Sequence, residues 1–593
     1  MREAFILCLM FITLTLVIYF LFFKKHKNLK FNIFFAFVSC IISISILVFP
    51  LLDFENIYLR ILGSIMYAMK CAGMGQEIGI LSKIDFGTMY GYVYFIFIIL
   101  LFLAAPLLTV SFIIAYFEKL TTYIKLAFSK NKKLYVFSDV NDKSLTIAKN
   151  IIKRKRGTIV FANTKEKLDL NIKSIKINKE ITDAHLNSKN NLIFYMISED
   201  EEKNLNDTLK LIDKYKNRDK TKIYVINKSE EAPIILDSMD KGKVVVDVIN
   251  EKERAIFNLL NDKPLFLNTI DNTISLLIVG CGNIGKEFLK DSVWCSMMPD
   301  YKLKILIIDI NADKIKDNIS VEMPELLDNY DITFLNADIK SNISIKTLKS
   351  KKDINYILVA TGNEDKNIDI SIMLRRLFLR EFNREPIINL YIENEYKQKQ
   401  ILTLVNEKGY SYDLNAFGNI HYLYKKNSII DSELERLAIQ VHLSYDSEDI
   451  DLHRYNLREY NKRSSRASAL HIKYKLYSVL KDKFTEDMKE NLKLFRNMYS
   501  PKIEKMLTKN EHDRWMAYTR SIGYVYAPLD VVAKYYKKNK HYIHYLARMH
   551  PALVEFNELD NVSKKLSKIT SKKINFVDSD KKIIKNIYEK VDL

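Results

Sequence analysis

Three long runs without a charged side chain lie near the start of this 593-residue chain, and they constrain its fold more than any other feature. They cover residues 4–23, residues 31–52 and the segment between Asp85 and Glu118. A helix rises about 1.5 Å per residue, so about 20 apolar residues cross a bilayer core of about 30 Å. The runs predict three membrane-spanning helices within residues 1–118. A cleavable signal peptide is the alternative for the first run, but that run is longer than a signal peptide's apolar region and KKHKNLK follows it.

The placement of lysines predicts how these spans are oriented. Residues 24–30 carry four lysines, and five more follow the third run within residues 119–133. The loop over residues 53–89 mixes acidic and basic side chains. Basic linkers face the cytoplasm under the positive-inside rule. The prediction is a multi-pass protein of the inner (cell) membrane, surrounded by membrane lipid, with its N-terminus outside and its C-terminal domains in the cytoplasm.

The loop between the second and third runs is too polar to span a membrane, yet too apolar for a free loop. Its residues 57–71 fit a pore helix, and the glycine-rich AGMGQEIG follows. Non-helical backbone persists at membrane depth only where it is buried in protein or lines a water path. One interpretation is therefore a re-entrant pore loop over residues 57–80, as in tetrameric cation channels, with Gly73, Gly75, Gln76 and Glu77 at the pore. The potassium-filter pattern TVGYG is absent, and an amphipathic helix on the outer surface is the alternative.

Charge and cysteine content argue against several classes of protein. The net charge is +19, but the lysines are scattered through the chain and form no basic, aromatic-interleaved surface, so we expect no nucleic-acid binding. The five cysteines form no CxxC pair and no cluster with histidine, which argues against a metal site and a disulfide framework. Cys281 and Cys295 fit a reducing cytoplasm.

After Lys133, short apolar runs alternate with helical patterns. This alternation predicts parallel sheets with right-handed crossovers. The predicted fold is a membrane α-helical region followed by two tandem Rossmann-like α/β domains, over residues 130–268 and 272–425, and a mainly α-helical domain over residues 428–593. The first turn of the first α/β domain, SDVNDKS, lacks the glycines that let a phosphate approach. We therefore expect no dinucleotide bound there by the usual route.

The second α/β domain opens with ISLLIVGCGNIGKEFLK, which places a G-x-G-x-x-G pattern between an apolar strand and a helix. Gly280 makes the tight turn, Gly282 lets the backbone approach a pyrophosphate, and Gly285 lets helix and strand pack closely. NAD(H) or an adenine nucleotide is the predicted ligand; glycines that serve only packing are the alternative. The predicted cofactor-binding residues are Gly280, Gly282, Asn283, Ile284, Gly285, Asp309, Asp338, Thr361 and Gly362.

Membrane spans followed by two Rossmann units resemble the regulator-of-potassium-conductance (RCK, or TrkA-N) arrangement. The resemblance covers about residues 130–425 and is carried by the three glycines, by Asp309 and Asp338, and by the VATGNED stretch. In that family such domains pair into a cytoplasmic ring that pulls on the pore helices. The resemblance implies a homo-oligomer, expected here to be a tetramer, and ligand gating in place of turnover.

Helical patterns dominate from about residue 428, and NKRSSRASALHIKYKL and EHDRWMAYTRSIGYVYAP stand out among them. Trp515, Tyr518 and Ile522 fall on one helix face, and Gly523 ends that helix before an extended chain. Arginines bind phosphate with planar forks, and aromatic rings stack on a base. The pattern predicts a pocket for a small nucleotide ligand. Its predicted ligand-binding residues are Arg463, Ser464, Arg466, His512, Arg514, Trp515, Tyr518, Tyr524 and Tyr526.

A purely structural interpretation of these residues stays open. Trp515 and the tyrosines would then belong to the core, and the arginines would pair with Glu511, Asp513 and Glu504. His512 beside an acid invites a hydrolase interpretation, but the sequence shows no nucleophile in matched spacing. We therefore predict no enzymatic activity.

Three motifs in order, NKRSSRASALHI, NEHDRWMAYTRSIGYVYAP and HPALVEFNEL, resemble the RyR domain, the helical repeat named from ryanodine receptors. The resemblance covers roughly residues 455–565, and this domain also occurs fused to TrkA-N domains in bacterial proteins. It implies a cyclic or ADP-ribose-type nucleotide ligand and an antiphage role. The predicted function is a ligand-gated, cation- or potassium-like ion channel. The alternative is a non-conducting membrane sensor that oligomerises on ligand binding and disrupts the membrane.

Overall fold

The computed structural model divides into two compact units, Met1–Asn131 and Lys132–Leu593. The predicted span over residues 4–23 and the predicted pore residue Gln76 lie outside the residues that the structure describes. The described residues are 29–75, 77–116, 125–129, 131–153, 157–163, 172–184, 186, 189–229, 231–405, 408–425, 433–444, 456 and 458–591.

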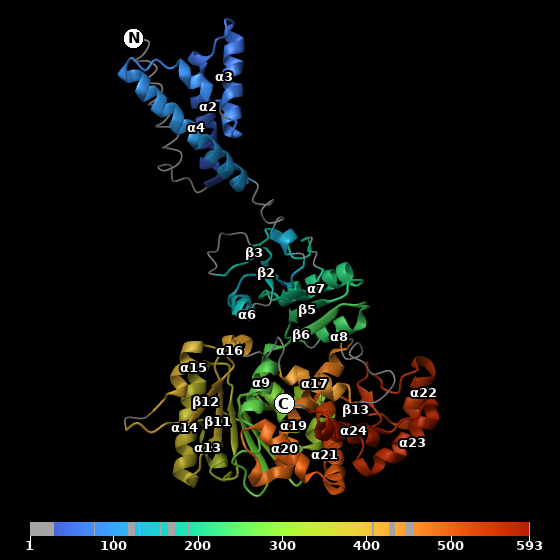
Figure 1. Cartoon of the computed structure of the whole chain (residues 1–593). Helices are drawn as coiled ribbons and strands as arrows, with labels where there is room; N and C mark the ends of the chain where they lie inside the picture. The colour runs from blue at the N-terminus through green and yellow to red at the C-terminus, as the bar shows by residue number, and fades with distance from the viewer. Residues whose placement is uncertain are drawn as a thin grey trace. The chain divides into compact units, whose positions relative to one another are not determined.

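Among the described residues of the first unit, two stretches are long and apolar enough to cross a membrane: Ile33–Leu51 and Met89–Ile113. They lie on α2 (Leu29–Val48), with the short 3₁₀ turn that follows it, and on α4 (Met89–Tyr116) (Figure 1). Both stretches fall within predicted spans and pass by length and composition alone, a test that the core helix of a soluble protein also passes. The two helices pack on each other, and the rings of Phe37 and Phe112 stack with centroids 5.1 Å apart.

The predicted pore loop contains a third helix, α3 (Ile57–Ala72), which has two different faces. One face is buried, and there Tyr67 packs on Phe102 of α4 with ring centroids 5.8 Å apart. The other face exposes large apolar side chains such as Leu62 and Met66. The glycine-rich segment after α3 leads into a 3₁₀ turn, Ile78–Lys83, and Lys70 pairs with Glu77 at 2.9 Å. An amphipathic helix fits both interpretations of this loop, so the pore residues stay a prediction.

The second unit contains a first six-stranded parallel sheet, with strand order β3-β2-β1-β4-β5-β6. Its central strands are almost continuously buried and apolar, as expected where helices cover both faces of a parallel sheet. The strands are β1 (Leu134–Phe137), β2 (Thr158–Phe161), β3 (Ile175–Lys176), β4 (Leu192–Met196), β5 (Thr221–Ile226) and β6 (Val245–Ile249). The helices are α6 (Asp142–Lys153), α7 (Glu201–Tyr215), α8 (Glu231–Ser238) and α9 (Glu251–Asp262).

The second sheet repeats this topology, with strand order β12-β11-β10-β7-β8-β9, again all parallel. The predicted α/β class is therefore confirmed: two Rossmann-like sheets follow one another. The strands are β7 (Thr273–Val279), β8 (Lys302–Asp309), β9 (Ile332–Asn336), β10 (Tyr356–Val359), β11 (Ile387–Tyr391) and β12 (Leu414–Phe417). The helices are α10 (Asn283–Cys295), α11 (Ala312–Glu322), α12 (Pro324–Asn329), α13 (Asn342–Leu348), α14 (Glu364–Phe382), α15 (Glu395–Leu402) and α16 (Ile420–Lys425).

The described C-terminal region is mainly helical, with one short strand pair. Gly523 has a φ of +83°, so a left-handed turn lets the chain leave α21 for β13, as the sequence predicted. The helices are α17 (Glu433–His442), α19 (Glu459–Leu480), α20 (Met488–Met498), α21 (Pro501–Ser521), α22 (Leu529–Asn539), α23 (Leu559–Thr570) and α24 (Phe576–Glu589). The paired strands are β13 (Val525–Tyr526) and β14 (Met549–His550).

One hydrophobic core joins both sheets to the C-terminal helices. Trp294 of α10 is fully buried, and its ring lies edge-on to Phe257 of α9 (5.8 Å) and to Tyr518 of α21 (6.2 Å). Phe266 stacks on Tyr477 of α19 with centroids 3.8 Å apart. Aromatic pairs of this kind add to the stabilisation that burial alone provides. The helical region is therefore packed directly onto the α/β layers.

Candidate functional site

A cavity of about 950 Å³ lies at the carboxyl ends of the strands in the second sheet. Val279 ends β7, Asp309 ends β8 and Ala360 follows β10, and all three line this cavity. The two halves of the sheet, β7-β8-β9 and β10-β11-β12, meet where β7 lies beside β10, so the strand order reverses there. Ligands of open parallel sheets bind outside the carboxyl ends of the strands at such a switch point. The volume also falls within the range of roughly 300–1,000 Å³ that is usual for ligand pockets.

All but one of the predicted cofactor-binding residues line this cavity. The exception is Gly285, which packs beneath the turn: a Cβ there would lie 2.2 Å from the carbonyl oxygen of Gly280. Gly280 has a φ of +84°, and its Cβ would lie 2.6 Å from the carbonyl oxygen of Ala360. At Gly282, by contrast, a Cβ would meet nothing within 4 Å. Gly280 and Gly285 thus allow close approach of neighbouring backbone, and Gly282 leaves space at the cavity. The predicted residues that line it are Gly280, Gly282, Asn283, Ile284, Asp309, Asp338, Thr361 and Gly362.

Gly285→Ala is expected to lower the free energy of unfolding by about 1–3 kcal/mol, since the added methyl group overpacks the junction of α10 and β7. Gly282→Ala is the matched control, because its methyl group enters open space at an ordinary φ of −69°. Thermal unfolding followed by tryptophan fluorescence compares the two variants. Equal melting temperatures would contradict the packing role of Gly285.

The cavity meets the start of α10, which is suited to bind an anion. Gly282 is the N-cap of α10 and supplies no side-chain hydrogen bond to the first turn. The first four N–H groups of a helix have no partner within the helix, and they carry a partial positive charge. Asn283 and Ile284 of this turn line the cavity. A phosphate placed here would accept hydrogen bonds from the first N–H groups of α10, which no capping side chain occupies.

Asp309 lies where a carboxylate can meet a ribose. Its Oδ2 accepts the N–H of Cys281 (2.8 Å), and its Oδ1 accepts the N–H of Asn311 (2.8 Å). An ionised carboxylate has about four acceptor positions, so two remain for ligand hydroxyl groups. Burial, together with the nearby charge of Asp309, raises the pKa of the Cys281 thiol to about 12, which keeps this thiol neutral.

The remaining lining has mixed polarity, as a dinucleotide requires. Thr361 donates its hydroxyl to Asn367 Oδ1 (2.7 Å), which holds the turn after β10 in place. Four lysines and several carboxylates border the same space, and Glu364 accepts the N–H of Glu393 (2.8 Å). The uncapped start of α10 and the neighbouring lysines could hold the pyrophosphate of NAD(H) or of an adenine nucleotide. The free acceptor positions of Asp309 could hold its ribose hydroxyl groups. The lysines are Lys252, Lys314, Lys340 and Lys366.

The equivalent turn of the first sheet is occupied by its own side chains. Asn141 Oδ1 accepts the N–H of Ser144 (2.9 Å), and Ser144 Oγ accepts the N–H of Asn141 (2.9 Å). Ser138 Oγ accepts the N–H of Ile197 (2.9 Å) in the same region. A phosphate at the start of α6 would have to compete with Asn141 for that helix N–H group.

Arg514, a predicted ligand-binding residue, is fully buried. It lines neither the cavity at the second sheet nor a second cavity, of about 490 Å³, among the C-terminal helices. Its Nη2 donates to Glu511 Oε1 (2.7 Å), and Lys475 Nζ lies 2.6 Å from Glu511 Oε2. Ser468 also donates its hydroxyl to Glu511 (3.1 Å). Burial alone would raise the pKa of Glu511, but Arg514 and Lys475 outweigh it and lower this pKa to about 2. For Arg514, the structure matches the ion-pair interpretation that the sequence left open.

Arg463 and Arg466 also take part in ion pairs within the second unit. Arg466 donates through Nε to Glu435 and through Nη1 to Glu459, both at 2.7 Å. Arg463 Nη2 lies 3.4 Å from Glu253 of α9, and nearby carboxylates raise the pKa of Arg463 although burial opposes them. Neither arginine lines either cavity. Both link α19 to neighbouring elements.

Asp247 of β6 is the centre of this network and is buried. Lys222 Nζ lies 2.6 Å from its Oδ2, and Lys462 of α19 donates to its Oδ1. Burial would raise the pKa of Asp247, but these lysines and Arg466 hold it well below the ordinary value. The charged carboxylate therefore joins α19 to the first sheet.

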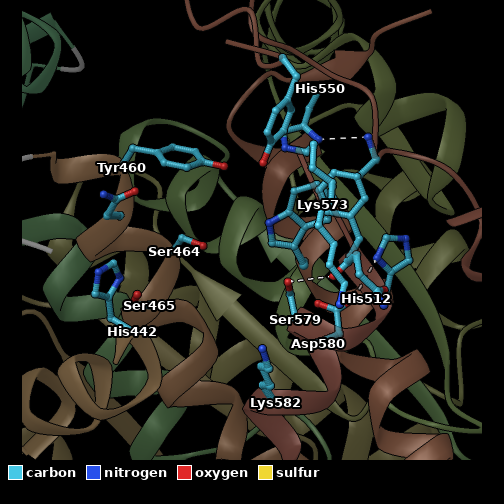
Figure 2. A pocket seen from close by; sticks show the side chains of 17 residues that line it. His442, Tyr460, Ser464, Ser465, His512, His550, Lys573, Ser579, Asp580 and Lys582 are labelled. Carbon is cyan, nitrogen blue, oxygen red and sulfur yellow. Dashed lines mark hydrogen bonds and ion pairs between the residues drawn. The ribbon is translucent and has the colours of Figure 1, made fainter. Parts of the chain in front are cut away.

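The other predicted C-terminal residues separate into two groups. Ser464, His512 and Trp515 line the second cavity, of about 490 Å³ (Figure 2). The three tyrosines do not line it: Tyr518 packs on Trp294, Tyr524 lies 5.8 Å from the ring of Tyr460, and the N–H of Tyr526 donates to Glu325. The structure thus brings together three of the nine residues predicted there.

Several residues of the second cavity had no role in the sequence analysis, among them Lys573, Ser579 and Asp580. They lie around the start of α24, where Asn575 caps the helix by accepting the N–H of Asp578 (3.1 Å). Asparagine followed three residues later by an acid is a recognisable helix-start pattern. The sequence could have located this helix start, although not the cavity beside it.

No protein-family model matches this chain, and no curated protein sequence matches it. Among solved structures, one titled GsuK Channel aligns with 70% of this chain and 96% of its own, at 15% identity and a TM-score of 0.34. Another, titled GsuK channel bound to NAD, aligns with 68% of this chain and 84% of its own, at 13% identity and a TM-score of 0.33. Both TM-scores are too low for the likeness to carry an argument.

Proposed function

We propose that this chain forms a ligand-gated membrane ion channel, cation- or potassium-like, in which a nucleotide at the second sheet controls permeability. The observation that carries the proposal is the cavity at the carboxyl ends of β7, β8 and β10, lined by the GCGNIG turn. The same chain holds two helices long and apolar enough to cross a membrane. A nucleotide site joined to apolar helices is the arrangement that a gated membrane protein needs.

NAD(H) or an adenine nucleotide is the ligand that the cavity fits. The first turn of α10 would bind the pyrophosphate, and Asp309 would accept hydrogen bonds from the ribose. Gly282 leaves room for that approach, because nothing lies within 4 Å of where its Cβ would be.

The energetic demand on such a ligand is modest. A ligand shifts a conformational equilibrium only by the difference between its affinities for the two states. A shift from mostly closed to mostly open takes about 5.5 kcal/mol. In the tetramer that we propose, each subunit would supply about 1.4 kcal/mol of this, or a tenfold difference in affinity.

Full-length protein in planar bilayers provides the test. We expect discrete, ion-selective current steps whose open probability changes when NAD is added. The Gly282→Asp variant places a carboxylate where the pyrophosphate would lie, and it is expected to show steps without that response. Irregular leakage of large dyes from vesicles would favour the membrane-disrupting alternative. Unchanged permeability while NAD is demonstrably bound would contradict both.

A further inference from the structure

The second cavity lies among the C-terminal helices and shares no lining residue with the cavity at the second sheet. Its walls come mainly from α19, α21 and the first turns of α24. In Figure 2, Ser464 and Ser465 lie on one side, and His512, Ser579 and Asp580 lie on the other. Its volume of about 490 Å³ suits a small molecule, since ligand pockets usually measure roughly 300–1,000 Å³.

One side of this cavity is aromatic. The rings of Trp515 and His550 lie 4.8 Å apart at 68°, and His512 stacks on Trp515 at 5.8 Å. Tyr542 and Phe576 extend this wall, with ring centroids 6.0 Å apart. Aromatic faces at a cavity favour a planar ring that can stack on them. Burial, with a contribution from His512, lowers the pKa of His550 to about 3, so this ring is neutral at pH 7.

The opposite side offers hydroxyl groups from α19. Ser464 and Ser465 both line the cavity, and Ser465 is only 4% exposed. Within the described part of the chain, neither hydroxyl has a hydrogen-bond partner. A serine hydroxyl can donate to a ligand oxygen and accept from a ligand donor, so both are available to a polar group in the cavity.

Positive charge gathers at the start of α24. Lys573 and Lys582 both line the cavity, and Lys582 is 3.2 Å from Asp578. Asn575 already caps the first turn of this 14-residue helix and Asp578 lies in that turn, so the positive charge here comes from the lysines. Lys573 is exposed, lines the cavity and lies two residues before Asn575, the cap of this helix.

Asp580 is the one carboxylate among the lining residues, and it is already paired. Its Oδ2 lies 3.4 Å from His512 Nδ1, and His512 Nε2 lies 2.8 Å from the carbonyl oxygen of Val554. Burial raises the pKa of Asp580 to about 6, although His512 opposes the rise. At pH 7 this carboxylate is mostly ionised, and its ion pair with His512 offsets part of that charge. Lys573 and Lys582 on the same lining leave the balance in favour of an anion.

Helix α19 connects this cavity to the first sheet. It presents Ser464 and Ser465 to the cavity, while Lys462 and Arg466 hold Asp247 and its neighbours in the buried network. A ligand that draws the two serines toward α24 would therefore act on a helix already fastened to β6. Binding at the cavity has a physical path to the α/β layers.

We propose that this cavity binds a nucleoside monophosphate, with its base on Trp515 and its phosphate between Lys573 and the two serines. The proposal adds a second ligand to the proposed function and does not depend on the cavity at the second sheet being filled.

Calorimetric titration of full-length protein in detergent with AMP tests this site. All proteins carry Gly282→Asp, which is expected to weaken AMP binding at the second sheet. We expect this background to bind AMP, and Lys573→Glu to weaken the affinity at least about tenfold, because a hydrogen-bonded charge is lost and a repulsive one is added. Ser464→Leu fills the cavity and should weaken binding as well. Lys572→Glu is the matched control, since Lys572 is exposed next to Lys573 but does not line the cavity.

Adenosine and inorganic phosphate separate the two halves of the ligand. We expect each alone to bind more weakly than AMP. The proposal is overturned if the Gly282→Asp background does not bind AMP, or if Lys573→Glu and Ser464→Leu bind it as the background does. NAD binding to otherwise unchanged protein is measured in parallel, so failure at one cavity is distinguished from failure at the other.

Discussion

Replacing Arg514 by alanine is expected to lower the free energy of unfolding by about 3–5 kcal/mol, the usual cost of removing one member of a buried ion pair. Arg514 and Glu511 are both fully buried, and the guanidinium donates to both carboxylate oxygens. Without Arg514, the charge of Glu511 would be balanced by Lys475 alone. The alanine would also leave a cavity where a large buried side chain had been.

Tryptophan fluorescence during thermal unfolding reads this effect directly. Both tryptophans of the chain, Trp294 and Trp515, lie in the second unit, so the signal reports on that unit. Lys509→Ala is the control, since Lys509 lies on the same helix but is exposed. A melting temperature for Arg514→Ala equal to that of Lys509→Ala would refute the structural role.

The same ion pair predicts a pH dependence. The folded-state pKa of Glu511 is about 2, below its ordinary value of 4.5. A depressed carboxyl pKa stabilises the fold above the unfolded-state value and loses that effect as pH falls. The stability difference between the unsubstituted protein and Arg514→Ala should therefore be full above about pH 4.5 and shrink as the pH falls toward 2. A difference that stays constant across this range would argue against a charged Glu511.

Because Arg514 holds a buried ion pair, a functional defect in Arg514→Ala would not show that Arg514 binds a ligand. The sequence placed Arg514 at a ligand, and loss of a ligand response in the variant would seem to support that placement. In the structure, such a loss would follow from weakened packing of α21 against α19. Lys573→Glu and Ser464→Leu are better probes of ligand binding, because they change the lining of a cavity.

Gly282→Asp is expected to weaken NAD binding at least about hundredfold, or about 2.7 kcal/mol, because it places a carboxylate where the pyrophosphate would lie. The fold should tolerate the change. The backbone φ of Gly282 is −69°, which any residue can adopt, and a Cβ there meets nothing within 4 Å. The effect should therefore appear in affinity and not in stability.

Calorimetric titration of full-length protein with NAD measures this loss. Gly282→Ala is the comparison variant, because its methyl group occupies the same space without charge and should weaken NAD binding less than the carboxylate does. Melting temperatures of both variants should match that of the unsubstituted protein. Normal NAD affinity in Gly282→Asp would show that the glycine turn serves packing alone, which is the alternative that the sequence left open.

The α/β class and most of the cavity at the second sheet could be predicted from the sequence, because both depend on local patterns. Short apolar runs specify buried parallel strands, and the glycine spacing of GCGNIG specifies a turn between strand and helix. The carboxyl ends of parallel strands meet at one edge, so Asp309 and Asp338 could be placed beside Gly280 without coordinates. The strand order then brought Thr361 and Gly362 to the same edge.

The C-terminal site could not be predicted in the same way. An arginine that is spaced to bind phosphate has the same local sequence as one that pairs with a buried acid. The partners of Arg466 are 31 and 7 residues away, and Asp247 lies 215 residues from Lys462. Only the packing of α19 against α17 and β6 brings these charges together. Ser464 and Ser465 of the same helix line the second cavity.

The sequence by itself determined the apolar runs, the two α/β repeats and the glycine turn, since helix and strand periodicity and backbone freedom act over a few residues. Tertiary structure decided which charged side chains are buried in ion pairs and which serines border a cavity. The physical reason is desolvation: a charge buried by packing must find a partner inside the protein, wherever in the chain that partner lies.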